Sequence, residues 1–432
     1  MACLHHRRSA GRPPARRPAL VAVVVLFMFA AATPAFSASA ESVGSAAVAT
    51  AAEPLAAAQA VLDARTRAVR GKDRGAFLAT VDPQAPPVFK AAQGRQFDGL
   101  RSLPLASFAL RASTDDTGDL GTGLAGRYGG ARVFLPETRQ VYRFEGYDDR
   151  DAVDHLWLTF VQRDGTWFVG GDDDLDAVGL ETDRQLWDAG PVRLERTEHV
   201  IVLSHPEQVE RAAALAAIAE EAAVAFAGQW SQPWSGRLPV ILPGSVDELE
   251  RLLESTVDLD KFVAFAGYGV EHDETGWAAT APRVYVQDAR LSLYDRPGQV
   301  ETLVHELVHF ASAPMSGPFV PAWVHEGVAD WVAVGRPTGE RRPPGGDARL
   351  PRDFEMSTGP AAAVVRAYGE SRSAVSLLAG RRGPDAPPAF FKRLGAVRVA
   401  PGSVDHIVDA TLREAENLSL GELEAAWAAR RP

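Results

Sequence analysis

Two histidines and a glutamate stand at a spacing that suits a metal ion. His305 and His309 are four residues apart, so on a helix their imidazoles lie on one face, one turn from each other. Two such nitrogens can hold Zn²⁺ at about 2.0–2.1 Å. Glu306 directly follows the first histidine, so it points beside the metal, where it can take a proton from a bound water. This segment predicts a metal centre that activates water.

A catalytic zinc also needs a third protein ligand and an open position. Glu326 lies on a second predicted helical segment, and Asp330 falls on the same face one turn later. Asp330 can therefore accept a hydrogen bond from the far nitrogen of a ligand histidine and orient the ring. A thiolate ligand is not expected in the mature protein, because the only cysteine, Cys3, lies in the N-terminal segment that reads as a signal peptide. We predict one Zn²⁺ ion held by His305, His309 and Glu326.

The residues around these ligands favour helices but leave an alternative. Apolar residues give the histidine-bearing helix a broad buried face. Unpaired polar groups are costly in such a face, so three of them need a reason. The alternative is a structural helix that carries polar residues incidentally. A helix turns His325 about 100° away from its neighbour Glu326, so we interpret His325 as a packing residue or part of a cleft wall.

The first half of the chain changes from helical to extended patterns. Apolar spacing predicts helices at 54–70 and 74–81. The later segments rich in β-formers predict strands at 108–112, 131–135, 140–147, 155–163 and 166–169. Asp164 and Gly165 predict a hairpin turn between the last two.

This order of elements, with its closing strand Asp-Gly-Thr-Trp-Phe-Val, resembles the nuclear-transport-factor-like (SnoaL-like) cone fold over residues 54–176. That fold hosts enzymes, small-molecule binders and interaction modules, so the resemblance implies no activity.

The second half begins with strands and ends with helices. The predicted strands are 200–203, 238–242, 263–265 and 283–286. Helices are predicted at 207–226 and 246–253, the second capped by Ser245. After Pro297 the pattern is helical, apart from loops that include a Gly-, Pro- and Arg-rich segment at 335–358, either a lid or disordered. Residues 276–280 or 283–286 could form an exposed strand edge for an extended peptide.

The two ligand segments resemble those of the gluzincin peptidases, in particular the bacterial peptidase MA-like group. They match its pattern, His-Glu-x-x-His followed by Trp-x-x-Glu-Gly-x-Ala, at residues 305–309 and 323–329. The resemblance implies a zinc peptidase with Glu306 as the general base. The Gly-x-Met-Glu-Asn segment of the gluzincin aminopeptidases is absent from the chain, which favours endopeptidase action or an unusual substrate.

The resemblance also implies a hydroxyl that stabilises the oxyanion of the reaction. Related gluzincins carry a Tyr just before the helix that follows the third ligand, and Tyr368 fits this role by its local context. Tyr368 could equally be an ordinary packing residue. Tyr285 and Tyr294 are alternatives for the role, and Arg366 is a weaker candidate for contact with the oxyanion or a substrate carboxylate.

Residues 1–40 have the layout of a secretory signal peptide. Five arginines precede an apolar run at 19–32, and Ala38-Ser39-Ala40 offers a cleavage site. The run is shorter than the roughly 20 residues that span a bilayer, so cleavage is favoured over an uncleaved anchor. Residues 41–53, rich in Ala and Ser, are expected to be a flexible linker. We expect a secreted or extracytoplasmic protein, attached to a membrane only if the segment is uncleaved.

Charge narrows the range of partners. The net charge is −11, and residues 1–40 hold five arginines and no acidic residue, so cleavage makes it −16. An acidic chain argues against nucleic acid or an anionic membrane as partner. A peptide or protein substrate is expected instead.

We therefore predict an α+β chain. A cone-like helix-plus-curled-sheet domain at 54–190 would precede a zincin-type peptidase domain at 191–432, with a mixed α/β upper lobe and a helical lower lobe. The alternative function is a non-catalytic extracytoplasmic ligand-binding protein with a relic zinc site.

Overall fold

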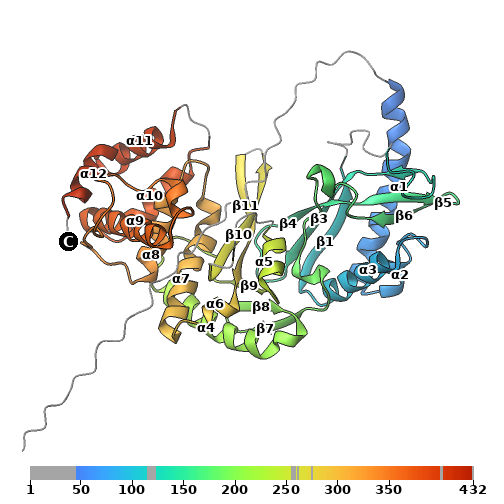
Figure 1. The fold of residues 1–432 in the computed structure, drawn as a ribbon, viewed down its shortest axis with the longest axis horizontal. Helices are drawn as coiled ribbons and strands as arrows, with labels where there is room; N and C mark the ends of the chain where they lie inside the picture. The colour runs from blue at the N-terminus through green and yellow to red at the C-terminus, as the bar shows by residue number, and fades with distance from the viewer. Residues whose placement is uncertain are drawn as a thin grey trace, which may run out of the picture.

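The protein has a mixed α+β fold with several small sheets, in agreement with the expected class (Figure 1). The computed structural model describes residues 45–113, 123–253, 259, 262–273, 276–398 and 402–430, without the side chains of 45–52, 271–273 and 276–277. The signal peptide predicted at 1–40 lies outside the described residues. Within the described ranges, no helix combines the length and apolar character that a membrane span requires.

The first half of the chain combines helices with two small antiparallel sheets. The helices are α1 (Ser45–Arg70), α2 (Arg74–Leu78) and α3 (Pro87–Leu100). The strands are β1 (Leu105–Ala112), β2 (Val133–Phe134), β3 (Glu137–Phe144), β4 (Ala152–Trp157), β5 (Thr159–Arg163) and β6 (Thr166–Gly171). They pair in the orders β1-β3-β4 and β2-β5-β6. Asp164 and Gly165 have positive φ angles of 47° and 81°, as a type I′ turn requires, so the predicted hairpin is confirmed.

Three details of this half differ from the expectation. Helix α1 begins at Ser45, so residues 45–53 are helical rather than a flexible linker, since their many alanines favour helix without any amphipathic pattern. Helix α3 was not predicted. The single strand expected at 155–163 is two strands in different sheets. Leu156, Leu158 and Phe160 are all buried across the break, so the alternating pattern continues through it.

The second half is built on a five-stranded sheet followed by helices. The strands are β7 (Arg193–Arg196), β8 (Val200–Ser204), β9 (Leu238–Leu242), β10 (Ala264–Asp273) and β11 (Gly276–Val286), in the order β10-β11-β9-β8-β7. The helices are α4 (Val209–Ala227), α5 (Val246–Leu252), α6 (Asp288–Leu291), α7 (Arg296–Ser312), α8 (Ala322–Ala333), α9 (Ala361–Arg382), α10 (Ala386–Gly395), α11 (Val404–Glu416) and α12 (Leu420–Ala428). Figure 1 shows α8–α12 as a separate helical lobe, with the β10–β11 hairpin between that lobe and the first half.

The edge strand of this sheet differs from the one predicted from the sequence. Val284 pairs with Val240 of β9 on one side and with Ala266 of β10 on the other, so residues 283–286 lie inside the sheet. Residues 276–280 pair with β10. Strand β10, at the end of the strand order, is therefore the edge next to the helical lobe.

Successive residues of the central strands bury opposite faces of the sheet. On one face Val202, Val240 and Ala266 join the core formed with α4, α7, α8 and α9. On the other face their neighbours Leu203 and Phe265 join a core shared with the first half, which includes aromatic residues of β3. Because the side chains of a strand alternate between faces, these apolar strands are buried on both faces of the sheet.

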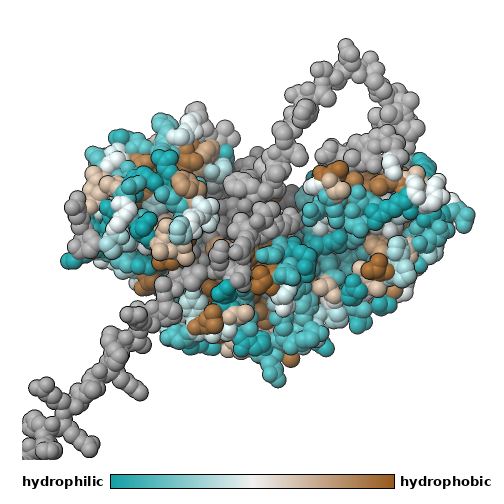
Figure 2. All heavy atoms as spheres, viewed as in Figure 1, coloured by the Kyte–Doolittle hydropathy of each residue, from teal (hydrophilic) through white to brown (hydrophobic). Residues whose placement is uncertain are grey.

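A buried ion pair joins the two halves inside the shared core. The Arg283 guanidinium of β11 donates to both carboxylate oxygens of Asp148, at 2.5 and 2.7 Å, and lies 4.5 Å from the centroid of the Phe144 ring. The Arg283 and Asp148 side chains are only 6% and 1% exposed. The surface visible in Figure 2 is mostly hydrophilic over the first half, whose apolar residues pack inward against the sheet.

Candidate metal centre

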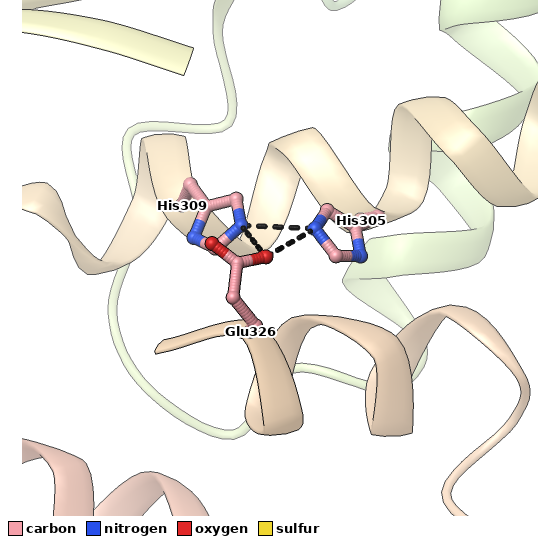
Figure 3. A group of neighbouring side chains, drawn as sticks. All are labelled: His305, His309 and Glu326. Atoms are coloured by element: carbon pink, nitrogen blue, oxygen red, sulfur yellow. Dashed lines mark hydrogen bonds and ion pairs between the residues drawn. The ribbon is translucent and has the colours of Figure 1, made fainter. Parts of the chain in front are cut away.

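Helices α7 and α8 bring the predicted ligands together. The Asp295 side chain caps α7 by accepting from the Gly298 amide at 3.0 Å, and α8 begins directly after Pro321. His305 and His309 lie one turn apart on α7, and Glu326 lies on α8. All three side chains are buried, and their ligand atoms form a group that could hold a metal ion (Figure 3).

The distances in this group fit a tetrahedral ion. His305 Nε2 lies 3.0 Å from His309 Nε2 and 3.2 Å from Glu326 Oε2, and His309 Nε2 lies 3.5 Å from Glu326 Oε2. Tetrahedral bonds of about 2.0–2.1 Å would separate ligand atoms by roughly 3.3 Å. Two imidazole nitrogens and one carboxylate oxygen therefore face a common point at the spacing that a Zn²⁺ ion needs.

The electrostatics of the site favour a cation. Burial opposes a charge on His305, but hydrogen bonds to Asp330 and Glu326 more than offset it and raise its pKa to about 10. Burial acts against the charge of Glu326 as well, yet the two histidines, His309 first, lower its pKa to about 2. The carboxylates that draw a proton onto His305 would equally attract a metal ion.

Asp330 lies where a supporting carboxylate is expected. Its Oδ1 accepts a hydrogen bond from His305 Nδ1 at 2.9 Å, so His305 keeps Nε2 for the metal. On the far side of Asp330, Arg372 of α9 approaches Oδ2 at 3.7 Å, and the Arg372 Nε donates to Glu340 at 3.1 Å. Arg372 was not singled out from the sequence, because no motif spacing links it to α8.

Glu306 occupies a buried position beside the ligands. Its side chain is fully buried, and its carboxylate has no well-formed hydrogen bond to a described residue, although the Ala266 backbone of β10 lies beside it. Burial raises the pKa of Glu306 to about 8, against the opposing effect of His305. A carboxyl group that binds and releases a proton near neutral pH suits a general base that later acts as an acid.

Of the three tyrosines proposed from the sequence, Tyr368 is the one that lies beside the ligands. Its ring stacks near the His305 ring, with centroids 6.3 Å apart and planes 29° apart. Burial, followed by the charges of Glu326 and Asp330, raises the pKa of the Tyr368 hydroxyl well above its usual range, which keeps it a hydrogen-bond donor. Tyr368 lies inside α9 rather than before it, because α9 already begins at Ala361 after Pro360.

The alternatives to Tyr368 lie away from the predicted ligands. Tyr285 belongs to the shared core, on the opposite face of the sheet. Tyr294 precedes α7, whose first residue lies roughly 13 Å along the helix axis from His305. The charge of Arg366 interacts with the Glu370 carboxylate, and both side chains lie against the segment 335–358. That segment is bound to α9 and α12, since the Glu340 amide donates to Ser376 and the Leu350 amide donates to Glu424.

His325 packs beside the ligands without facing them. Its Nε2 lies 3.2 Å from the Ser316 hydroxyl, and its ring meets Phe391 edge to face at 4.8 Å. Another group that could hold a metal, Glu198, His199 and Glu220, is partly exposed. There the Glu220 carboxylate already accepts from the Thr197 hydroxyl and the His199 amide, which holds the β7–β8 turn on α4.

Tyr268 is a residue at this site that the sequence interpretation missed. It lies on the edge strand β10, at a register shift between Gly267 and Gly269. Its hydroxyl is buried beside Ser316. The signal was present in the Gly-Tyr-Gly sequence, because glycines inside a strand often mark a bulge.

Comparisons of the chain with models of protein families, with curated proteins and with solved structures found no match. The donor set itself therefore indicates the chemistry. A His-His-Glu group with a second carboxylate behind one histidine and a buried glutamate beside it is an arrangement able to hold a metal ion and move protons next to it.

Proposed function

We propose that this protein is an extracytoplasmic zinc-dependent peptidase of the gluzincin type. In this proposal residues 191–432 form the peptidase domain and residues 54–190 a nuclear-transport-factor-like domain. The observation that carries the proposal is the meeting of His305, His309 and Glu326 at tetrahedral spacing. Two imidazoles and one carboxylate form a ligand set typical of catalytic zinc, which leaves one position open for water or substrate.

A bound zinc ion would polarise the substrate carbonyl and lower the pKa of the attacking water. The remaining steps fall to the protein's own side chains. Glu306, buried beside the ligands, accepts the proton of the water and returns it to the leaving amine. The Tyr368 hydroxyl donates a hydrogen bond to the carbonyl oxygen as negative charge develops there. Asp330 holds the His305 ring in the orientation and tautomer that binding needs.

The edge strand supports a peptide substrate. Strand β10 ends the sheet on the side of the helical lobe, and its residue Ala266 belongs to the same core as α7. An extended peptide can add to such an edge through main-chain hydrogen bonds. The scissile bond would then lie against the helix that carries Glu306.

The test compares the wild type with Glu306→Gln and Tyr368→Phe. Each protein is purified, its zinc content is measured by mass spectrometry, and cleavage is followed on a diverse peptide library. We expect one zinc per chain in all three proteins. Loss of the general base should slow cleavage about 10²–10⁴-fold, and loss of the hydroxyl should slow it about 10²–10³-fold.

The alternative is a non-catalytic extracytoplasmic ligand-binding protein with a relic zinc site. The same experiment separates the two functions, because a relic site retains zinc without cleaving any peptide. A wild type that holds stoichiometric zinc and leaves the whole library intact would therefore replace the peptidase proposal with this one.

A further inference from the structure

Strand β10, which pairs on one side only among the described strands, carries side chains on the face that packs against α7. In β10, Ala264 and Ala266 face the core that contains α7, whereas Phe265 faces the shared core. Side chains of a strand alternate, so Tyr268 follows Ala266 on the α7 side. The register shift between Gly267 and Gly269 comes at this residue, and such bulges turn a side chain to a new direction.

A series of neighbouring polar groups connects the predicted metal ligands with the Tyr268 hydroxyl. The His309 and His325 rings lie 6.3 Å apart, and His325 Nε2 lies 3.2 Å from the Ser316 hydroxyl. Ser316 in turn lies beside the Tyr268 hydroxyl. Tyr268 is thus at the His309 end of the site, while Tyr368 stacks on His305 at the other end.

The Tyr268 oxygen is buried, and among the described residues it meets the Ser316 hydroxyl without forming a well-formed hydrogen bond. A buried hydroxyl without a partner is unfavourable by about 1–3 kcal/mol in proteins. Phenylalanine would fill the same space without that cost. Ser316 uses only part of the hydrogen-bonding capacity of this hydroxyl, and a ligand entering along β10 would supply a further partner.

We propose that Tyr268 is a substrate-binding residue, whose hydroxyl forms a hydrogen bond with the main chain of a peptide bound along β10, at the His309 end of the site. This inference rests on the proposed peptidase function and adds a specific contact to it. Ser316 positions the phenol from behind. The contact is separate from the predicted ligands, the general base and the oxyanion donor.

The experiment measures inhibitor binding rather than turnover. Zinc-loaded wild type, Tyr268→Phe and Ser316→Ala are titrated by calorimetry with two probes, acetohydroxamate and a leucine-rich tripeptide hydroxamate. Acetohydroxamate binds the metal but is too short to reach β10, whereas the tripeptide extends along the strand. Tyr285→Phe is the matched control, because it removes a phenol hydroxyl from the neighbouring strand on the opposite face.

We expect Tyr268→Phe to weaken the tripeptide hydroxamate about three- to tenfold, as for the loss of one neutral hydrogen bond. Ser316→Ala should weaken it less, while acetohydroxamate binding and the control variant stay at wild-type values. Unchanged tripeptide binding in Tyr268→Phe overturns the assignment, and so does an equal loss for both probes, which would mean a disturbed metal site. A wild type that binds acetohydroxamate but no tripeptide would instead overturn the peptidase function together with the contact.

Discussion

Asp330 is not itself a predicted metal ligand, but it determines which ring nitrogen of His305 faces the predicted ion. Its carboxylate holds His305 Nδ1 at 2.9 Å and is itself approached by Arg372. The predicted change is Asp330→Asn, which keeps the shape of the side chain but removes its charge. Zinc affinity should fall about 10–100-fold. Competition with a chromogenic chelator measures this affinity.

The matched control for that variant is Asp288→Asn. Asp288 forms a surface ion pair with Arg211, away from the ligands, and should leave zinc affinity unchanged. If Asp330→Asn bound zinc as tightly as this control, the carboxylate would not support the metal ligand.

The residues of the site differ in how far the sequence predicts them. His305, Glu306 and His309 follow from helical spacing alone, since a four-residue interval places two side chains on one face. Arg372 comes from α9 and lies behind Asp330, whereas Tyr268 comes from β10 and lies beside Ser316. Their positions depend on how these elements pack against α7 and α8, which no local pattern encodes.

At the scale of elements, the packing of α8 against α9 determines where Glu326 lies. Gly327 follows this ligand, and a methyl group added there would meet the Ser371 carbonyl oxygen at 2.8 Å and Val375 Cγ2 at 2.9 Å. Only glycine allows the two helices to come this close. The Glu-Gly pair of the motif thus has a packing reason: the glycine lets α8 bring its glutamate to the histidines.

Gly327→Ala should therefore force α8 away from α9 and displace Glu326. Overpacking of this kind costs about 1–3 kcal/mol, so we expect a lower midpoint of thermal unfolding together with weaker zinc binding. Gly421→Ala in α12 is the control, because its added methyl group meets nothing within 4 Å. That control should be neutral or stabilised by about 0.4–1 kcal/mol. Equal behaviour of the two variants would contradict the role given to the helix contact.

The sequence predicts most elements of the second half but not their neighbours in space. The apolar runs of β8 and β9 and the cap of α5 by Ser245 were recognisable, and the Ser245 hydroxyl does accept from the Glu248 amide at 3.1 Å. The strand order is not recognisable in this way, so the sequence predicts an edge at residues 276–280 or 283–286, although the first segment pairs with β10 and the second lies between β9 and β10. Pairing partners depend on contacts between distant segments, whereas caps and periodicity are local.

At the scale of the whole molecule, the first half of the chain packs against one face of the five-stranded sheet and forms the shared core with it. Leu203, Phe265 and Tyr285 bury their side chains against residues of the first half. A fragment of residues 191–432 should therefore expose an apolar face of the sheet and aggregate. Size-exclusion chromatography and binding of a hydrophobic dye compare it with residues 54–432, which we expect to remain soluble and to unfold cooperatively. A soluble fragment with the unfolding midpoint of the longer chain would show that the shared core contributes little.

Arg283 gives this joined architecture a consequence for how the protein can evolve. Recombination that replaced residues 54–190 with another domain would leave its guanidinium buried without Asp148, and Phe265 without an apolar surface to cover it. Phe265 lies on β10, so the strand that carries Tyr268 would lose the side chains that pack against one of its faces. We therefore expect the two halves to be exchangeable only together, because substitutions in the first half have to stay compatible with the strand that the proposed substrate would meet.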